Sequence, residues 1–348
     1  MMLSLSDNKM VGSREGKRVA SSKGAIFRSK YFRFFLGVAV GAALLFLSVR
    51  DVSWSEVKGE VEGIIYAWIV LAAFLYWIEL GLRIVRWRVL LSQLKPPIAG
   101  DQVAIAFIAG YAANNVLPAK LGEAFRADLL GRLANVSRLT AFGSIIVERL
   151  FDMVVVLGMT AFGVLHVTTT HLDTLEDVTN GLTILVAPIA ILVIVVYFLV
   201  ARKNNQLNIR LRALSVKVQN LIQGLHVLED SSSYLKLLSS TLVIWMLNCL
   251  AIWSIMMALE VQLNVNQTIL LIGITGISAA IPAAPAGIGT LQYAFYITAV
   301  LFGFSSSAAL VASVIVQIVL LGSATVVGAI AYSYAISNHL LQGDETGT

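Results

Sequence analysis

Residues 114–126 read NNVLPAKLGEAFR and separate two apolar runs, 101–117 and 121–133. Pro118 stops a helix, and Gly122 allows another stretch of backbone to approach closely. Half-helices of about 14–17 residues are short for a membrane span, which needs roughly 20, so the pair is typical of a re-entrant hairpin. Broken backbone at membrane depth is tolerated only where it is buried in protein or lines a polar cavity. We therefore predict a helical hairpin whose break belongs to a functional site.

The composition is that of a membrane protein. Of 348 residues, 58% are hydrophobic and only 13% are charged, and the mean hydropathy is +0.83. Soluble domains carry about 25% charged residues, so we predict an all-α, polytopic integral membrane protein. One cysteine, Cys249, excludes an intramolecular disulfide and a cysteine-based metal site, and the four histidines are scattered. No phosphate loop is recognisable either, and we expect no metal, no cofactor and no nucleic-acid partner.

Six apolar runs are long enough to cross a bilayer. They lie at 33–50, 64–91, 139–165, 182–201, 234–259 and 308–336. A second interrupted pair, 268–281 and 287–302, contains two prolines and two glycines at its break, which predict a rigid turn with close backbone approach. These residues are Pro282, Pro285, Gly287 and Gly289. The expected fold therefore has about six full transmembrane helices plus two re-entrant or broken hairpins.

Loop charges predict the orientation of the spans, because loops rich in Lys and Arg stay in the cytoplasm. The loops 51–63 and 166–181 are acidic and are expected outside the cell. The basic stretches, expected inside, are 83–95, 120–138 and 202–217. We predict a multi-pass protein of the cytoplasmic (inner) membrane with both termini in the cytoplasm.

Three further segments are read from composition and periodicity. The tail 1–32 is basic and is predicted to be disordered; it is interpreted as a topology determinant, with anionic-lipid contact as the alternative. Residues 205–228 have leucines at helical spacing and predict an amphipathic helix on the inner membrane surface, or else a solvated connector. Residues 339–348 are predicted to form a flexible C-terminal tail. The rest, 33–338, is expected to be one transmembrane domain.

The order of the elements predicts an inverted repeat. Residues 33–165 and 182–336 each contain span, span, broken hairpin, span, in opposite orientations. Transporters built from such repeats bind their substrates at the interrupted segments. The hairpin tips are therefore expected on opposite sides of one midplane site.

Intramembrane charges provide the main candidates for binding. Glu148, Arg149 and Asp152 lie near the middle of one span, and Glu148 and Asp152 share a helix face. Such residues indicate an anion or proton site, or else a self-neutralised network that fixes helix packing. Arg83 and Arg86 follow Glu79 on another span and could grip a lipid phosphate or extend to the headgroup layer.

The two breaks add polar candidates. Glu123 and Arg126 are expected in the first turns of a helix whose N-terminus attracts anions, and Lys120 adds charge; the alternative is an ordinary cytoplasmic loop. Thr290 and Gln292 could hydrogen-bond a headgroup without neutralising it. The complete predicted binding set is Asn114, Asn115, Lys120, Glu123, Arg126, Arg83, Arg86, Glu148, Arg149, Asp152, Thr290 and Gln292, shaped by Pro118, Gly122, Pro282, Pro285, Gly287 and Gly289.

Three motifs together resemble the lysylphosphatidylglycerol synthase transmembrane region family, also called the flippase-like domain family. They are NNVLPAKLGEAFR at 114–126, ERLFD at 148–152 and PAAPAGIGT at 282–290, and the resemblance extends over roughly 35–335. The chain departs from the family pattern at Lys120, where Arg is frequent, at Ala286, which replaces a glycine, and at Gln292, where an acid is common. Well-understood members join this region to a soluble aminoacyl-transferase domain and move the modified lipid across the bilayer. No such domain follows here, so the resemblance implies the translocase half and not the synthase half.

We expect a protein that binds and translocates an anionic or aminoacylated phospholipid, or a lipid-linked glycan precursor, between leaflets. With no nucleotide site, movement is expected to be downhill or coupled to an ion gradient. Two alternatives stay open. One is a non-catalytic membrane partner of a separate lipid synthase or glycosyltransferase, and the other is a membrane-embedded lipid transferase with Glu148 or Glu123 as base. The sequence indicates no oligomeric state.

Overall fold

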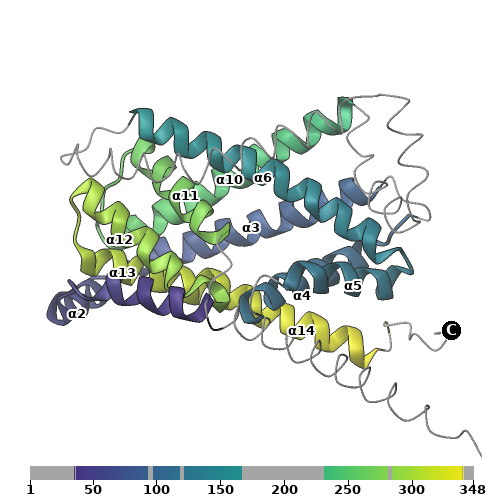
Figure 1. The fold of residues 1–348 in the computed structure, drawn as a ribbon, viewed down its shortest axis with the longest axis horizontal. Helices are drawn as coiled ribbons and strands as arrows, with labels where there is room; N and C mark the ends of the chain where they lie inside the picture. The colour runs from purple at the N-terminus through teal and green to yellow at the C-terminus, as the bar shows by residue number, and fades with distance from the viewer. Residues whose placement is uncertain are drawn as a thin grey trace, which may run out of the picture.

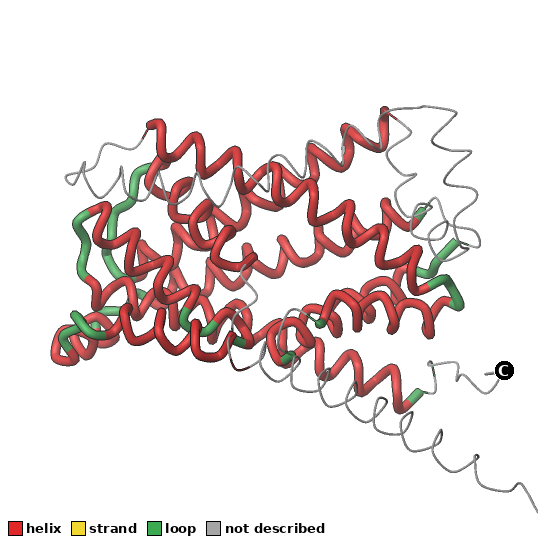
Figure 2. Tube along the Cα trace, in the orientation of Figure 1, coloured by secondary structure: helices red, strands yellow, loops and turns green. Residues whose placement is uncertain are grey.

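The computed structural model describes residues 35, 37–92, 97–117, 121–166, 231–280, 284–338 and 340, and all structural statements concern these residues. They form helices joined by short loops (Figures 1 and 2). Several of the helices are long and apolar enough to cross a membrane, so the protein is an all-helical polytopic membrane protein. Four predicted segments lie outside the described residues: the basic tail, the span 182–201, the segment 205–228 and, apart from Leu340, the C-terminal tail 339–348.

The helices follow the predicted boundaries closely. In chain order they are a first helix Gly37–Val49, α2 (Trp54–Glu62), α3 (Tyr66–Leu91), α4 (Gly100–Val116), α5 (Gly122–Ala134), α6 (Arg138–His166), α10 (Ser231–Ala258), α11 (Val265–Ala280), the 3-10 turn η3 (Pro285–Gly287), α12 (Thr290–Phe302), α13 (Ser306–Ile315), the π-helical segment η4 (Val316–Gly322) and α14 (Ser323–Ser337). Five predicted spans therefore coincide with described helices. The arms of the predicted hairpins correspond to α4 with α5 and α11 with α12.

One prediction needs correction, because the supposed external loop 51–63 contains helix α2. The first helix and α2 are bent by 84° at the break between them, and Ser53 precedes α2 with extended backbone. The segment was predicted to be a loop because it is rich in acidic residues. Two of these accept hydrogen bonds from the neighbouring segment: Ser307 donates to Glu56 at 2.9 Å, and Ser305 donates to Glu60 at 3.2 Å. Helix α2 is therefore docked on the start of α13.

The turn between the first helix and α2 is also hydrogen-bonded to the second hairpin. The Tyr296 hydroxyl of α12 donates a hydrogen bond to Asp51 at 2.9 Å, and Arg50 forms an exposed ion pair with the same carboxylate. The hydrogen bond from Tyr296, followed by that from Arg50, holds the pKa of Asp51 below its ordinary value.

Helix length separates full spans from half-helices. The apolar stretches long enough to cross a bilayer are Tyr66–Leu91, Leu235–Ala258, Pro285–Phe302 and Ser306–Ser337. In the third of these, Ala286 has a φ of 54°, which breaks the helix, so only the 13 residues of α12 are regular. At 1.5 Å per residue α12 is about 20 Å long, less than the roughly 30 Å of hydrocarbon. Helix α6, with 29 residues, is long enough, although it carries charges at its middle.

Helices of the two halves of the chain pack against each other in a reciprocal way. Helix α4 packs along α14, and α11 packs along α6. Each hairpin therefore packs its first arm against the last span of the other half of the chain. Glycines permit the close approach: a Cβ at Gly328 would meet the backbone of Ile108, and one at Gly273 would meet the backbone of Thr160. Helices α3 and α10 pack antiparallel at the centre, as Figure 1 shows.

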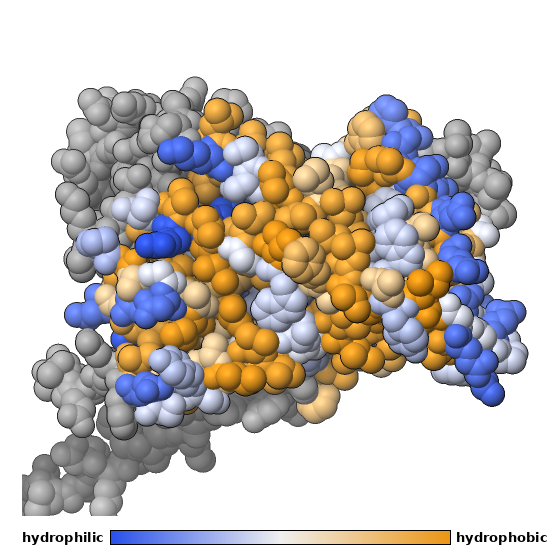
Figure 3. Space-filling view, turned by 180° about the vertical axis from the view of Figure 1, so that it is seen from behind, coloured by the Kyte–Doolittle hydropathy of each residue, from blue (hydrophilic) through white to orange (hydrophobic). Residues whose placement is uncertain are grey.

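The surface is consistent with a membrane around the helices. Figure 3 shows a broad hydrophobic area across the middle of one face, with hydrophilic side chains gathered toward the two ends of the molecule. Exposed apolar side chains, such as Phe74, Ile318 and Ile330, contribute to this kind of surface. Such exposure of large apolar side chains is typical of a lipid-facing surface.

Candidate functional site

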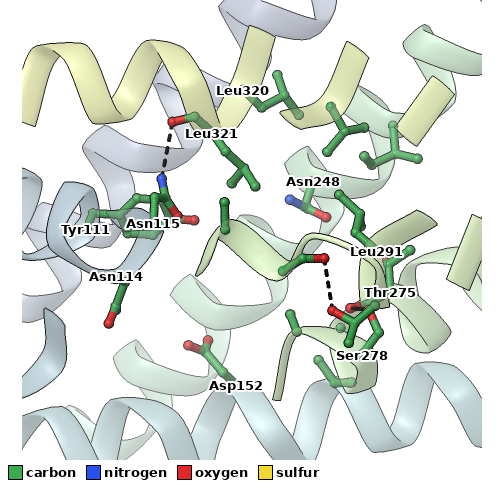
Figure 4. A pocket seen from close by; sticks show the side chains of 18 of the residues that line it. Tyr111, Asn114, Asn115, Asp152, Asn248, Thr275, Ser278, Leu291, Leu320 and Leu321 are labelled. Carbon is green, nitrogen blue, oxygen red and sulfur yellow. Dashed lines mark hydrogen bonds between the residues drawn. The ribbon is translucent and has the colours of Figure 1, made fainter. Parts of the chain in front are cut away.

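A cavity of about 320 Å³ lies where the two hairpins meet. Its wall includes the end of α4, the beginning of α5, the turn η3 and the first residues of α12. Helices α3, α6, α10 and α11 and the η4 segment complete it (Figure 4). Because α4 also contacts η3 directly, the two predicted breaks adjoin one space rather than two.

The first break presents two amides with different partners. Asn115 donates hydrogen bonds to the Thr325 hydroxyl at 2.9 Å and to the Leu321 carbonyl at 3.2 Å, both on the last span. The Oδ1 atom of Asn114 is buried and has no hydrogen-bond partner among the described residues. Helix α4 ends at Val116, and Leu117 is extended, as expected before a proline. The predicted residues Pro118 and Lys120 lie outside the described part of the chain.

Gly122 begins α5 in contact with α4. A Cβ at this position would collide with the backbone nitrogen of Asn114, and with the carbonyl of Gly110. Both are main-chain atoms inside a helix and cannot turn away as a side chain would. Gly122 is therefore required by the close approach that the sequence predicted.

Substitution of Gly122 by alanine should destabilise the protein. We expect a loss of roughly 1–3 kcal/mol, the usual effect of overpacking, read as a lower melting temperature of the purified protein in detergent. Gly158→Ala is the matched control, since nothing lies within 4 Å of a Cβ added there. Equal melting temperatures for the two variants would contradict the predicted close contact.

The most accessible cation of the site is Arg149. Its Nε atom lies 2.8 Å from Oε1 of Glu123, so α5 and α6 are joined at the cavity wall. Its side chain is 37% exposed, whereas those of Arg83 and Arg86 are 7% and 1% exposed. Arg149 also lies 3.4 Å from Asp152. Among the four predicted arginines, Arg149 therefore has the most exposed side chain, although its Nε atom is itself buried.

Behind Arg149, helices α3 and α6 are joined by buried ion pairs. Arg86 contacts both oxygens of Asp152, at 2.8 and 3.1 Å, and lies 3.2 Å from Glu148. Arg83 pairs with Glu79 at 2.8 Å and lies 3.5 Å from Asp152. The i,i+4 spacing of Glu148 and Asp152 places both carboxylates on the face that meets α3.

Arg126 has a different environment. Its guanidinium lies over the ring of Trp87, 3.6 Å from the centroid, and 4.2 Å from that of Phe107. It also forms an ion pair with Glu148 at 2.8 Å. Arg126, Arg86 and Glu148 do not line the cavity. They lie behind the cavity wall. Arg126 stacks on aromatic rings, and both arginines are buried in ion pairs with Glu148.

The network contains equal numbers of opposite charges. Its cations are Arg83, Arg86, Arg126 and Arg149, and its anions are Glu79, Glu123, Glu148 and Asp152. Buried charges are tolerated when they are paired and hydrogen-bonded. The ion pairs around Arg86 form the self-neutralised network that was one of the two alternatives. Arg149 lies at the cavity wall, where the other alternative, an anion site, stays a prediction.

The second break is neutral and rigid. Pro285 begins η3, Ala286 and Gly289 have positive φ values of 54° and 87°, and a Cβ at Gly289 would overlap the carbonyl of Gly41 in the first helix. Thr290 lines the cavity, and its hydroxyl donates to the carbonyl of Gly287 at 3.0 Å. Pro282 lies outside the described residues.

Both polar atoms of the Gln292 amide form hydrogen bonds within the protein. Its Oε1 accepts a hydrogen bond from the backbone of Gly289 at 2.7 Å, and its Nε2 donates to Gln317 at 2.8 Å. It is buried and is not part of the cavity wall. Its contacts therefore tie the break to the π-helical segment of the last span.

Sequence reasoning left several cavity residues out of the predicted set. Asn248 donates to Glu79 at 3.0 Å, and Trp245 donates to Asp152 at 3.2 Å, both from α10. The buried hydroxyl of Tyr76 has no hydrogen-bond partner among the described residues and adjoins the cavity. A single asparagine in an apolar span was a signal for the first, whereas aromatic residues are too common in spans to be diagnostic. Within the described residues, no cluster of His, Cys, Asp and Glu could hold a metal ion.

Comparison with known proteins shows similarity to one family of membrane proteins and to individual relatives. A family model described as "Lysylphosphatidylglycerol synthase TM region" matches residues 34–328. A UPF0104 membrane protein of Methanocaldococcus jannaschii is 24% identical over 230 residues, 66% of this chain and 96% of the relative. Glycosyltransferase AglD of Haloferax volcanii is 24% identical over 326 residues, 83% of this chain, and the match spans about half (51%) of AglD.

Proposed function

Since the chain belongs to the lysylphosphatidylglycerol synthase transmembrane region family, we propose that it binds an amphipathic lipid with an anionic headgroup and moves it between leaflets. The substrate class comprises anionic or aminoacylated phospholipids and lipid-linked glycan precursors. One observation carries the proposal. A cavity with charged walls lies between two interrupted hairpins, inside a bundle whose surface is apolar.

The cavity is suited to a headgroup. Its volume of about 320 Å³ corresponds to roughly ten water molecules at about 30 Å³ each, which is enough for a polar headgroup and too little for two acyl chains. Arg149, whose side chain is partly exposed and lines the cavity, is the proposed contact for phosphate, and Arg83 lines the same cavity. The carboxylates of Glu123 and Asp152 would receive an aminoacyl ammonium group or sugar hydroxyls.

The packing of the helices supports an inverted repeat as the basis of movement. A pseudo-two-fold axis between the halves would produce the two equivalent contacts, α4 against α14 and α11 against α6. The pairs α5 with α6 and α12 with α13 correspond in the same way. In such transporters one repeat moves against the other around a fixed site.

The distribution of charge supports a cytoplasmic membrane orientation with the first hairpin inside. Arg88, Arg132 and Arg138 lie at one end of the molecule, near the contact of α4 with the end of α5. Acidic residues of α2, Glu56 and Glu60, lie at the other end with the loop before α13. By the positive-inside rule the first end is cytoplasmic.

Reconstitution tests translocation directly. The pure protein is placed in phosphatidylglycerol vesicles with a trace of the same lipid carrying a fluorophore on its headgroup, and a membrane-impermeant quencher is added outside. Translocation predicts that the quenched fraction exceeds the outer-leaflet half seen in protein-free vesicles. Quenching that stops at the protein-free value for phospholipid and for lipid-linked glycan would refute the proposal.

The similarity to Glycosyltransferase AglD favours a second candidate, a non-catalytic membrane partner of a separate glycosyltransferase or lipid synthase. This candidate predicts no transbilayer movement by the pure protein. It also predicts that a synthase or glycosyltransferase co-purifies in mild detergent and loses activity when this chain is removed. Movement by the pure protein without such a partner would exclude it as the main function.

A further inference from the structure

A second hollow lies on the outside of the bundle, beside the central cavity. Its wall is formed by Ala73 and Trp77 of α3, Ile288 of the second break, and Ile318 and Val326 of the last span, with neighbours from η4. Ile318 and Val326 are among the most exposed apolar side chains. We call this hollow the lateral groove.

The lateral groove and the central cavity share a thin wall. Ala286 lines both spaces. Along η4 the side chains divide: Val316 and Leu320 face the cavity, whereas Gln317 and Ile318 face the groove. One residue of the hairpin turn and one helical layer therefore separate a charged interior from an apolar exterior.

Two amide side chains close this wall. Gln317 accepts a hydrogen bond from Gln292 at 2.8 Å and donates one to the carbonyl of Ala286 at 3.3 Å. The backbone of the last span is π-helical at this place, a geometry that is rare and frequent at functional sites. The wall thus contains a few hydrogen bonds and an irregular helix beside the buried side chains of Val316 and Leu320.

We propose that the lateral groove binds an acyl chain of the lipid whose headgroup occupies the central cavity, with the hydrogen bonds of Gln317 forming the boundary between them. The inference rests on the proposed function. It adds the place where the hydrocarbon stays while the headgroup is inside. It also adds the route, past Ala286, by which headgroup and chain remain connected.

Chemistry favours a hydrocarbon chain over a polar partner in the groove. Among the described residues of its wall, the polar side chains are Gln317 and Ser323, and none is charged. Both polar side chains are hydrogen-bonded within the protein, since the Ser323 hydroxyl donates to the carbonyl of Leu320 at 3.0 Å. An acyl chain needs only apolar contact, which this wall supplies. A partner helix packed on the small residues of the wall, Ala73, Gly322 and Ser323, would instead keep lipid out of the groove and prevent its labelling from lipid.

Photolabelling tests the groove without depending on transport. The full chain is reconstituted in phosphatidylcholine vesicles with trace phosphatidylglycerol that carries a diazirine at the end of one acyl chain, and labelled peptides are mapped by mass spectrometry. We expect labelling around Ile318 and Val326 in excess of that at Ile330, which is equally exposed on the same helix (63% against 61% for Val326) but lies outside the groove. Equal labelling would identify ordinary boundary lipid and overturn the inference.

Groove-filling variants link binding to movement. Val326→Trp and Ile318→Trp should each remove the excess labelling and slow transbilayer movement roughly tenfold, the factor equivalent to 1.4 kcal/mol. The control Ile330→Trp should change neither. Transport at the wild-type rate in both groove variants would contradict acyl-chain binding in the groove and leave the proposed function intact. If the wild type labels the groove but moves no lipid, the proposed function fails and the acyl-chain site stands as a binding site alone.

Discussion

Arg149→Ala should abolish most lipid movement while the protein still folds and inserts. Arg149 lines the cavity and its side chain is partly exposed, so its loss removes the proposed phosphate contact and leaves the buried ion pairs of Arg83, Arg86 and Arg126 in place. Hydrogen bonds to charged groups contribute about 1.5–3 kcal/mol, and movement should therefore slow roughly 10- to 100-fold. The measurement is the headgroup-quenching assay, normalised to folded protein recovered in the vesicles.

The partner variant Glu123→Gln separates a binding role of Arg149 from a packing role. It removes the carboxylate that lies 2.8 Å from Arg149, while Asp152 still lies 3.4 Å from the guanidinium, which stays available to substrate. If Arg149 binds phosphate, Glu123→Gln keeps transport of an anionic lipid, and Arg149→Lys retains part of it. If the ion pair only fixes α5 against α6, Arg149→Ala and Glu123→Gln should lower the melting temperature by similar amounts. Transport per folded molecule should then stay at the wild-type level in both.

Much of the architecture could be predicted because it depends on local signals. Apolar runs set the five described spans to within a few residues, and the breaks were marked by Gly122, Pro285 and Gly289. Gly122 and Gly289 are needed for backbone reasons, namely contact without a Cβ or positive φ. Pro285 restricts φ at the start of η3. Helix α2 was missed because its acidic face, which binds α13, resembles a solvated loop in composition.

The arrangement of the charges could be predicted only in part. That Glu148 and Asp152 share a face follows from their spacing, but their partner Arg86 is 66 residues from Asp152 along the chain. Which arginine lies open in the cavity and which is buried between aromatic rings depends on how α3, α5 and α6 pack. Spacing cannot decide this, since Arg126 and Arg149 are both intramembrane arginines with acids nearby.

Arg86→Met should have the largest effect on stability of any single substitution in the network. Arg86 is 2% exposed, binds Asp152 through two nitrogen atoms, and lies 3.2 Å from Glu148. Methionine leaves two buried carboxylates with less positive charge than before. Breaking a buried pair by removing one partner costs about 3–5 kcal/mol, so we expect a large fall in the melting temperature in detergent and a low yield of folded protein.

Arg132→Met is the matched control for this prediction, because it removes an arginine from an exposed ion pair. The Arg132 side chain is 47% exposed and lies 2.9 Å from Asp128, and surface pairs contribute about 0–1 kcal/mol. The melting temperature should therefore stay near that of the wild type. Adding Asp152→Asn to Arg86→Met should recover part of the lost stability, because it removes the carboxylate that Arg86 bound and leaves Glu148 paired with Arg126 at 2.8 Å. The remaining network then has equal numbers of cations and anions. If Arg86→Met melts like the control, the ion pairs between α3 and α6 do not hold the two helices together, and the stability of the site must come from packing around Trp87 and Phe107 instead.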